Sequence, residues 1–173
     1  MPVRACQLPD EALLGRYTRS GAFTDCYVTE LPGTFSHAEY VRAFYTTWVF
    51  RLERAILKWA VARPSTDEQA RQLAEGSIDS FAAWHVEGRS ENQLLMSDFQ
   101  GRTRSWFMTG TQAAGNAART RLYFGSAVVP VTDSREGTAR PGPLFSALLG
   151  FHKLYSRVLL GAAKSRLSSL RVG

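Results

Sequence analysis

The stretch PLFSALLGFHKLYSRVLLGAAKSRL, from Pro143 to Leu167, decides the fold that we expect for this chain. Proline is favoured in the first turn of a helix, so Pro143 marks the predicted start. Apolar residues follow it in steps of three and four, which is the spacing of one helix face. They are Leu144, Leu148, Phe151, Tyr155, Leu159 and Ala162. We expect the extended runs between Ile78 and Val131 to cover this face, because a long apolar stripe is unstable in water.

The composition indicates a globular protein with one domain that spans residues 1–173. A chain of 173 residues is long enough for one substantial core and short for two. Its 45% hydrophobic and 21% charged residues are ordinary for a soluble domain. No apolar run reaches the ~18 residues that a membrane-spanning helix needs, and the N-terminus lacks the continuous apolar core of a secretory signal. We therefore expect a cytoplasmic protein without an integral membrane segment.

The formal net charge of +6 raises the question of nucleic-acid binding. The basic residues are spread thinly along the sequence, however, and no cluster of them is interleaved with aromatic residues. A solvated surface is therefore favoured over a nucleic-acid interface. A weaker alternative places the basic C-terminal helix against an anionic membrane surface.

Motifs for metal, nucleotide and nucleophilic chemistry are missing from the sequence. The histidines at positions 37, 85 and 152 are too dispersed for a metal triad, and Cys6 and Cys26 show neither metal nor redox spacing. In a reducing compartment these two cysteines are expected to be free thiols rather than a disulfide. No glycine-rich phosphate loop and no G-x-S-x-G nucleophile elbow occurs. We therefore expect no cofactor and no metal.

The first part of the chain predicts one strand and a long helix. Residues 1–21 read as irregular, and residues 22–31 are rich in β-formers and predict a strand. Ser36 and Glu39 form a capping box that starts a helix running to about Ala62. One side of this helix is apolar and is interpreted as core. It consists of Tyr45, Trp48, Leu52, Ile56 and Trp59.

A short polar helix and a run of strands follow. Ser65 and Glu68 predict a second capping box, and Gly76 closes the helix that it starts. Four extended runs come next: Ile78–Glu87, Asn92–Phe99, Arg102–Thr111 and Thr120–Val131. The gaps at Gly88–Glu91 and Gln100-Gly101 suit hairpins, and Ala113–Ala118 is predicted to be a small-residue loop. A strand, two helices, several strands and a final helix make an α+β domain.

Three strings within this order resemble a known group of proteins. They are SDFQGRTRSWFM (Ser97–Met108), TRLYFGSAVVP (Thr120–Pro130) and LLGFHKLYSRVLL (Leu148–Leu160). From Ala22 to Leu167 the chain resembles the START-like, or polyketide-cyclase-like (SRPBCC), helix-grip superfamily, and more closely an uncharacterised bacterial family within it. The resemblance implies a curved antiparallel sheet wrapped on the last helix, with a cavity between them. It also implies about six or seven strands, so strands beyond the five evident ones must come from residues 1–21 or from a split run.

The hairpins sort the side chains by sheet face, because neighbours along a strand alternate. A four-residue loop at Gly88–Glu91 places His85 opposite Leu94, and a two-residue turn at Gln100-Gly101 places Leu94 opposite Phe107. One face then holds Phe81, Ala83, His85, Leu94, Met96, Asp98, Ser105 and Phe107. The other holds Ala82, Trp84, Leu95, Ser97, Arg104, Trp106 and Met108. Both are apolar enough to be buried, and the first is favoured as the cavity wall because Arg104 would be costly inside unless paired.

The candidate site residues follow from this assignment. Those predicted to bind ligand are Phe81, His85, Leu94, Met96, Asp98, Phe107, Tyr123, His152 and Tyr155. His85 and Asp98 are also the candidate general bases. Both have a structural alternative, as a hydrogen-bonded strand histidine and as a carboxylate that bonds the backbone of its turn. Arg102 and Arg104 have the chemistry to grip an anion but are favoured as surface residues.

Three functions remain open from the sequence. The favoured one is binding of a small, largely hydrophobic molecule, such as a lipid, polyketide or aromatic metabolite, in the cavity beneath the C-terminal helix. The second is a cyclase- or hydratase-type enzyme that uses His85 or Asp98 as general base in the same cavity. The third is a protein–protein interaction module in which the exposed face around Trp84, Leu95 and Trp106 pairs with another copy, as a homodimer, or with a different partner protein.

Overall fold

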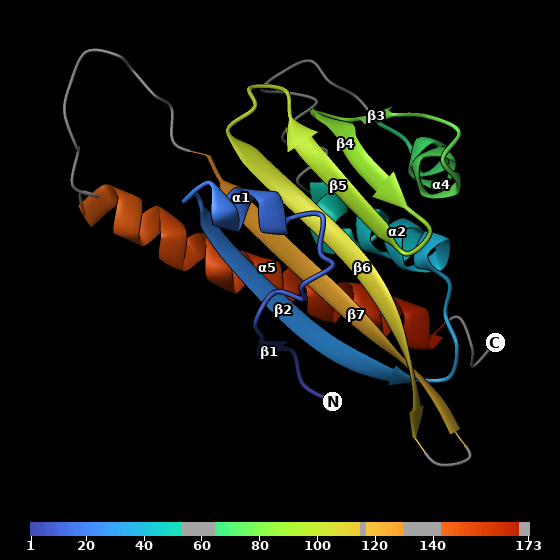
Figure 1. Cartoon of the computed structure of the whole chain (residues 1–173). Helices are drawn as coiled ribbons and strands as arrows, with labels where there is room; N and C mark the ends of the chain where they lie inside the picture. The colour runs from blue at the N-terminus through green and yellow to red at the C-terminus, as the bar shows by residue number, and fades with distance from the viewer. Residues whose placement is uncertain (53–64, 115–116, 130–142, 170–173) are drawn as a thin grey trace.

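The computed structural model describes residues 1–52, 65–114, 117–129 and 143–169. They form an α+β fold with a seven-stranded antiparallel sheet of order β1-β2-β7-β6-β5-β4-β3 (Figure 1). The strands are β1 (Arg4–Ala5), β2 (Phe23–Pro32), β3 (Ser80–Phe81), β4 (Trp84–Ser90), β5 (Gln93–Asp98), β6 (Thr103–Ala114) and β7 (Ala117–Val128). The helices with defined bounds are α1 (Gly15–Arg19), α2 (His37–Tyr45), α4 (Asp67–Glu75) and α5 (Pro143–Ser169).

The two faces of the sheet are covered by different parts of the chain. Figure 1 shows α2, α4 and α5 behind the sheet and α1 in front of it. We call residues 1–22 the N-terminal segment. The face of the sheet toward α2 and α5 is the inner face, and the face covered by the N-terminal segment is the outer face. The inner core joins side chains of α2, α4 and α5 to the sheet residues Leu94, Met96, Phe107, Leu122 and Phe124. An outer cluster forms a second core, made of Ala12, Leu14, Cys26, Leu95, Trp106, Met108 and Ala127.

The sequence predicted an irregular N-terminal segment. This prediction is wrong, because the segment contributes β1 and α1. Gln93, buried on β5, ties this segment to the sheet. Its Oε1 accepts from the Leu13 N–H and from the Trp106 indole N–H, each at 2.9 Å, and its Nε2 donates to the Glu11 carbonyl at 3.1 Å. All polar atoms of a buried amide are therefore engaged, which fixes the orientation of the segment.

The strand predictions are confirmed in outline and corrected at three places. The run at 78–87 is split into β3 and β4 by a turn at Ala82-Ala83, where Ala82 has a φ of 54°. The predicted loop at Ala113–Ala118 is mostly strand, since β6 reaches Ala114 and β7 starts at Ala117, and residues 115–116 lie outside the described residues. The hairpin loop predicted at Gly88–Glu91 is also wrong, because β4 continues to Ser90 and β5 begins at Gln93. The two additional strands come from the two sources expected, the N-terminus and a split run.

The helix predicted from Ser36 to Ala62 starts as expected but is broken. The capping box of Ser36 and Glu39 is confirmed, whereas α2 ends at Tyr45. The hydroxyls of Thr46 and Thr47 donate to carbonyls of the preceding turn, and Thr47 Oγ1 then accepts from the Phe50 N–H of a new helical segment that begins at position 48. This interruption of the helix breaks the predicted apolar side.

Two residues of that predicted apolar side face solvent rather than core. Trp48 is 73% exposed and Leu52 58% exposed, whereas Tyr45 is buried as predicted. Ile56 and Trp59 lie outside the described residues. The helical spacing of apolar residues therefore predicted the core positions correctly only as far as the end of α2, before the break at Thr46.

The second capping box lies one residue later than predicted. Thr66 and Gln69 form it, not Ser65 and Glu68. Threonine and glutamine supply the same acceptor and return bond as serine and glutamate, so the two registers are equivalent by pattern. Gly76 closes α4 as expected, with a left-handed φ of 79°.

The long helix α5 starts at Pro143, as predicted, and contacts β2, β7 and α2. Its side chains are described from Tyr155 onward. The buried ones are Ser156, Leu159, Leu160, Ala163 and Leu167. The predicted stripe at Tyr155, Leu159 and Ala162 is therefore rotated by about one residue, and Tyr155 and Ala162 lie at its half-buried edge.

An aromatic cavity as the candidate functional site

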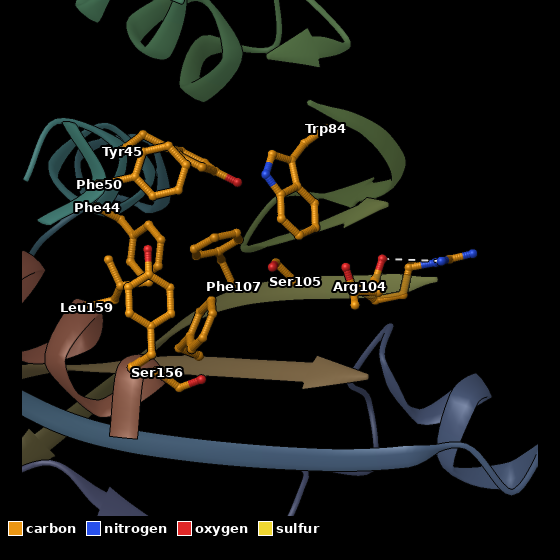
Figure 2. A pocket seen from close by; sticks show the side chains of 12 residues that line it. Phe44, Tyr45, Phe50, Trp84, Arg104, Ser105, Phe107, Ser156 and Leu159 are labelled. Atoms are coloured by element: carbon orange, nitrogen blue, oxygen red, sulfur yellow. Dashed lines mark hydrogen bonds between the residues drawn. The ribbon is translucent and has the colours of Figure 1, made fainter. Parts of the chain in front are cut away.

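A cavity of about 190 Å³ lies between the inner face of the sheet and the helices α2 and α5. Seven of its lining residues are aromatic: Phe44, Tyr45, Phe50, Trp84, Phe107, Phe124 and Tyr155. The others are Thr103, Arg104, Ser105, Ser156 and Leu159. Figure 2 shows Trp84 on one side of Phe107, with Phe44, Tyr45 and Phe50 on the other and Ser105 nearby.

The cavity exists because small residues stand beside large ones on the inner face. Phe107 pairs with Phe124 across β6 and β7, and one step along the same face Ser105 pairs with Ser126. The opposing helix brings another small residue, Ser156, to the cavity. Where two phenylalanines fill the layer between sheet and helix, the serines leave it partly empty, since packed side chains relax only partially around a missing volume.

The aromatic wall is built from rings that hold one another in place. The Phe44 ring lies 4.7 Å from that of Phe107 and 5.0 Å from that of Phe124, between centroids. Tyr45 and Phe50 meet edge to face at 4.7 Å. These separations suit favourable aromatic pairs, so the wall is preformed rather than assembled around a ligand.

Charge is kept out of the cavity. Arg104 lines it, but Figure 2 shows its guanidinium extending away from the other lining side chains. On the outer face Arg104 Nε donates to Glu87 Oε2 at 2.5 Å and to the Tyr17 hydroxyl at 2.7 Å. Tyr17 in turn donates to Glu87 Oε1. Arg104 is thus paired on the side away from the cavity. The desolvation cost expected for an unpaired arginine inside the cavity is therefore avoided.

A carboxylate lies two strands from Ser105 on the inner face. Asp25 pairs with Ser126 across β2 and β7, and Asp25 Oδ1 accepts from both the backbone N–H and the hydroxyl of Ser126. Its other oxygen, Oδ2, is buried without a hydrogen bond. Burial, followed by the negative charge of Asp25, raises the pKa of nearby Tyr27. Asp25 does not line the cavity, and no sequence pattern pointed to it as a site residue.

Of the nine predicted ligand-binding residues, Phe107 and Tyr155 line the cavity. Phe81, Leu94 and Met96 lie on the inner face but are buried in the core beside it. Tyr123 lies on the opposite face, with its ring 6.3 Å from that of Trp106. His152 is on α5, and its side chain is outside the described residues.

The two candidate bases are placed elsewhere. Asp98 Oδ1 accepts hydrogen bonds from the Arg102 N–H at 2.7 Å and from the Thr103 N–H at 3.0 Å. Asp98 therefore stabilises the backbone of its own turn, which was the structural role considered for it as an alternative to catalysis. His85 is exposed and pairs with Ser97 instead of Leu94, so it lies on the outer-face side of β4. Neither residue lines the cavity, and the enzyme interpretation loses both of the bases that it named.

The misplacement of His85 has a local cause. The tight turn at Ala82-Ala83 sets Trp84 opposite Phe81, and β4 carries an irregularity between Val86 and Gly88. Trp84 consequently pairs with Asp98 and turns to the inner face. The register of the second hairpin is confirmed, because Leu94 pairs with Phe107 and Met96 with Ser105.

The sequence patterns predicted little of the cavity wall. They placed Trp84 on the opposite face of the sheet, and they gave no signal for Phe44 and Phe50 as lining residues. The available signal was the alternation of serine and phenylalanine at Ser105, Phe107, Phe124 and Ser126, where small side chains interrupt an apolar face.

The face that would have paired with another copy is not open. Leu95 and Trp106 are 0% exposed beneath the N-terminal segment, and Trp84 lies on the other side of the sheet. The interaction-module interpretation therefore lacks the exposed apolar face on which it depended.

No family model matches the chain, and a search of curated proteins finds no significantly similar sequence. In the described part of the chain, no helix combines the length and apolar character needed to cross a bilayer. Within the same residues, no three histidine, cysteine or acidic side chains gather closely enough to hold a metal ion.

Proposed function

We propose that this chain is a START-like helix-grip protein that binds a small, uncharged molecule with a single ring in the cavity beneath α5. The observation that carries the proposal is the cavity itself, which is preformed, mainly aromatic and about 190 Å³ in volume. A seven-stranded antiparallel sheet with a long C-terminal helix on one face is compatible with the helix-grip architecture.

The size of the cavity favours a ligand smaller than most lipids or polyketides. Pockets for drug-sized ligands occupy about 300–1,000 Å³, whereas an engineered apolar cavity of about 150 Å³ holds benzene. A volume of about 190 Å³ therefore fits one ring with a small substituent. Hydroxyl groups of the Ser105, Ser156 and Tyr155 side chains provide the polar contacts that would orient such a substituent.

The chemistry of the wall favours a neutral ligand. Of the lining residues within the described part of the chain, Arg104 alone carries a charge, and it is paired with Glu87 on the outer face. A carboxylate or ammonium group would lose its hydration without gaining a partner. Burial of roughly 200 Å² of aromatic surface at about 25 cal/mol per Å² provides about 5 kcal/mol before the costs of association. Since about 5 kcal/mol alone corresponds to a dissociation constant of about 0.2 mM and the costs of association weaken binding, dissociation constants in the millimolar range are expected.

The test is an NMR titration with phenol, indole and benzoate. Phenol and indole should shift the resonances of cavity residues saturably, and benzoate should not, because its charge is unpaired in the cavity. Ser105→Leu should abolish this binding by filling the cavity, while Ser165→Leu, the same change on the exposed side of α5, should leave it intact. Equal binding by Ser105→Leu and the unchanged protein would refute the proposal.

A further inference from the structure

The two cysteines lie directly opposite each other where β1 meets β2. Ala5 pairs with Tyr27, so the next step of the same register sets Cys6 against Cys26. The Cys6 N–H donates to the Cys26 carbonyl at 3.0 Å and continues the ladder. The two sulfur atoms are 3.2 Å apart, and both thiols are free.

We propose that Cys6 and Cys26 form an oxidation site, at which a small-molecule disulfide such as oxidised glutathione converts the two thiols into one cross-strand disulfide. Directly opposed residues of an antiparallel pair have Cα atoms about 4.5–5.5 Å apart. This separation lies within the 4.4–6.8 Å that disulfides span. Rotation of the two side chains is therefore enough to bring the sulfurs into bonding distance, without a backbone shift.

The two thiols differ in a way that assigns their roles. Cys6 is half-buried and Cys26 is buried, so an oxidant reaches Cys6 first. The hydrogen bond with Cys26, aided by the charge of Arg4, lowers the pKa of Cys6, and the same contact together with burial raises the pKa of Cys26. Since the thiolate is the nucleophile, Cys6 is the attacking residue and Cys26 the resolving one.

The reaction is a two-step thiol–disulfide exchange. The Cys6 thiolate attacks one sulfur of the oxidant, forms a mixed disulfide and releases one thiol. Cys26 then gives its proton to solvent and attacks the Cys6 sulfur, which releases the second thiol. Two protein S–H bonds are lost, one S–S bond forms, and the oxidant is reduced to two thiols.

The disulfide would fasten the N-terminal segment, which carries part of the outer cluster. Residues between the two cysteines include Ala12 and Leu14, which are buried against the outer face. Closing this loop removes conformational freedom from the unfolded chain. For a loop of this length in a domain of this size, we expect the melting temperature to rise by about 6–12 °C.

The experiment is incubation of the full chain with oxidised glutathione at low protein concentration, followed by intact mass measurement and thermal unfolding. The expected product has lost two hydrogen masses and melts at the higher temperature. Trypsin cleavage at the exposed Arg16 and Arg19 should then leave two pieces that separate only after reduction.

A register variant provides the matched control. Ala5→Cys in a Cys6→Ala background keeps two thiols, but its new thiol points to the opposite side of β1 from Cys26 and should not close the loop. A stable glutathione adduct on Cys6 without loop closure would overturn the proposal. So would two unreacted thiols in the folded protein, or equal disulfide formation in the register variant.

Discussion

The two faces of this sheet are both buried, but their side chains are packed with different tightness. On the outer face the fit is tight at Gly125, where a Cβ atom would lie 2.9 Å from the Asp25 carbonyl oxygen and from Leu14 Cδ2, and 3.1 Å from Trp106 Cε3. On the inner face a cavity of about 190 Å³ remains among seven aromatic rings. At Gly125 the outer side has no room for a methyl group, whereas the inner side keeps space for a ring. The difference shows closer packing on the outer face at Gly125 than around the cavity, and it supports the proposed ligand site on the inner face.

Matched leucine truncations should expose this difference most strongly. Leu14 is fully buried in the outer cluster, whereas Leu159 borders the cavity. Leu14→Ala should cost about 4 kcal/mol of unfolding free energy and Leu159→Ala about 3 kcal/mol, because a side chain beside a void has fewer contacts to lose. Urea unfolding measures both. A larger cost at Leu159 would contradict the comparison.

Glycine-to-alanine substitutions test the packing of the outer face, because each adds a single methyl group. Gly125→Ala should destabilise the protein by about 2 kcal/mol, since two of the three atoms that its Cβ would meet are backbone or fully buried ring. Gly110→Ala is the control on the neighbouring strand, where the nearest atom is 3.7 Å from the added Cβ. Its effect on unfolding free energy should be less than about 0.5 kcal/mol. Equal effects in urea unfolding would show that the outer face can relax.

Low pH should reduce the free energy of unfolding through protonation of His37, the first residue of α2. Burial, aided by the positive charge of Arg89, lowers the pKa of His37 to about 4, although its backbone contact with Phe107 acts in the opposite direction. The unfolded state therefore binds a proton at higher pH than the folded state. Stability conferred by neutral His37 is complete above pH ~6.5 and is lost as the pH falls toward about 4.

At pH ~5.5 the expected loss is about 1 kcal/mol, the smallest of these effects. His37→Gln should flatten the dependence of unfolding free energy on pH between those limits. The control is His85→Gln, because that side chain is exposed and its replacement should keep the acid sensitivity of the unchanged protein. An unaltered profile for His37→Gln would show that other groups cause the acid sensitivity.

The sequence predicted the α+β class, the start of α5 and the register of β5 with β6, because each depends on a local signal. Pro143 marks a helix start, and the turn at Gln100-Gly101 fixes Leu94 opposite Phe107. The site was predicted less well, because a strand buried on both faces gives no alternation to identify the inner one. A single irregularity between Val86 and Gly88, together with a tight turn at Ala82, was enough to move His85 to the wrong side.

The contacts of Gln93 have a consequence for the order in which the chain becomes structured. This side chain binds the backbone at Glu11 and Leu13, about eighty residues earlier, and shares its oxygen with the Trp106 indole. Leu14 likewise packs in a cluster that needs Trp106 and Ala127. Residues 11–14 precede most of the sheet in the chain, so during synthesis they must wait for it before they can dock, and until then their apolar side chains remain open to other contacts.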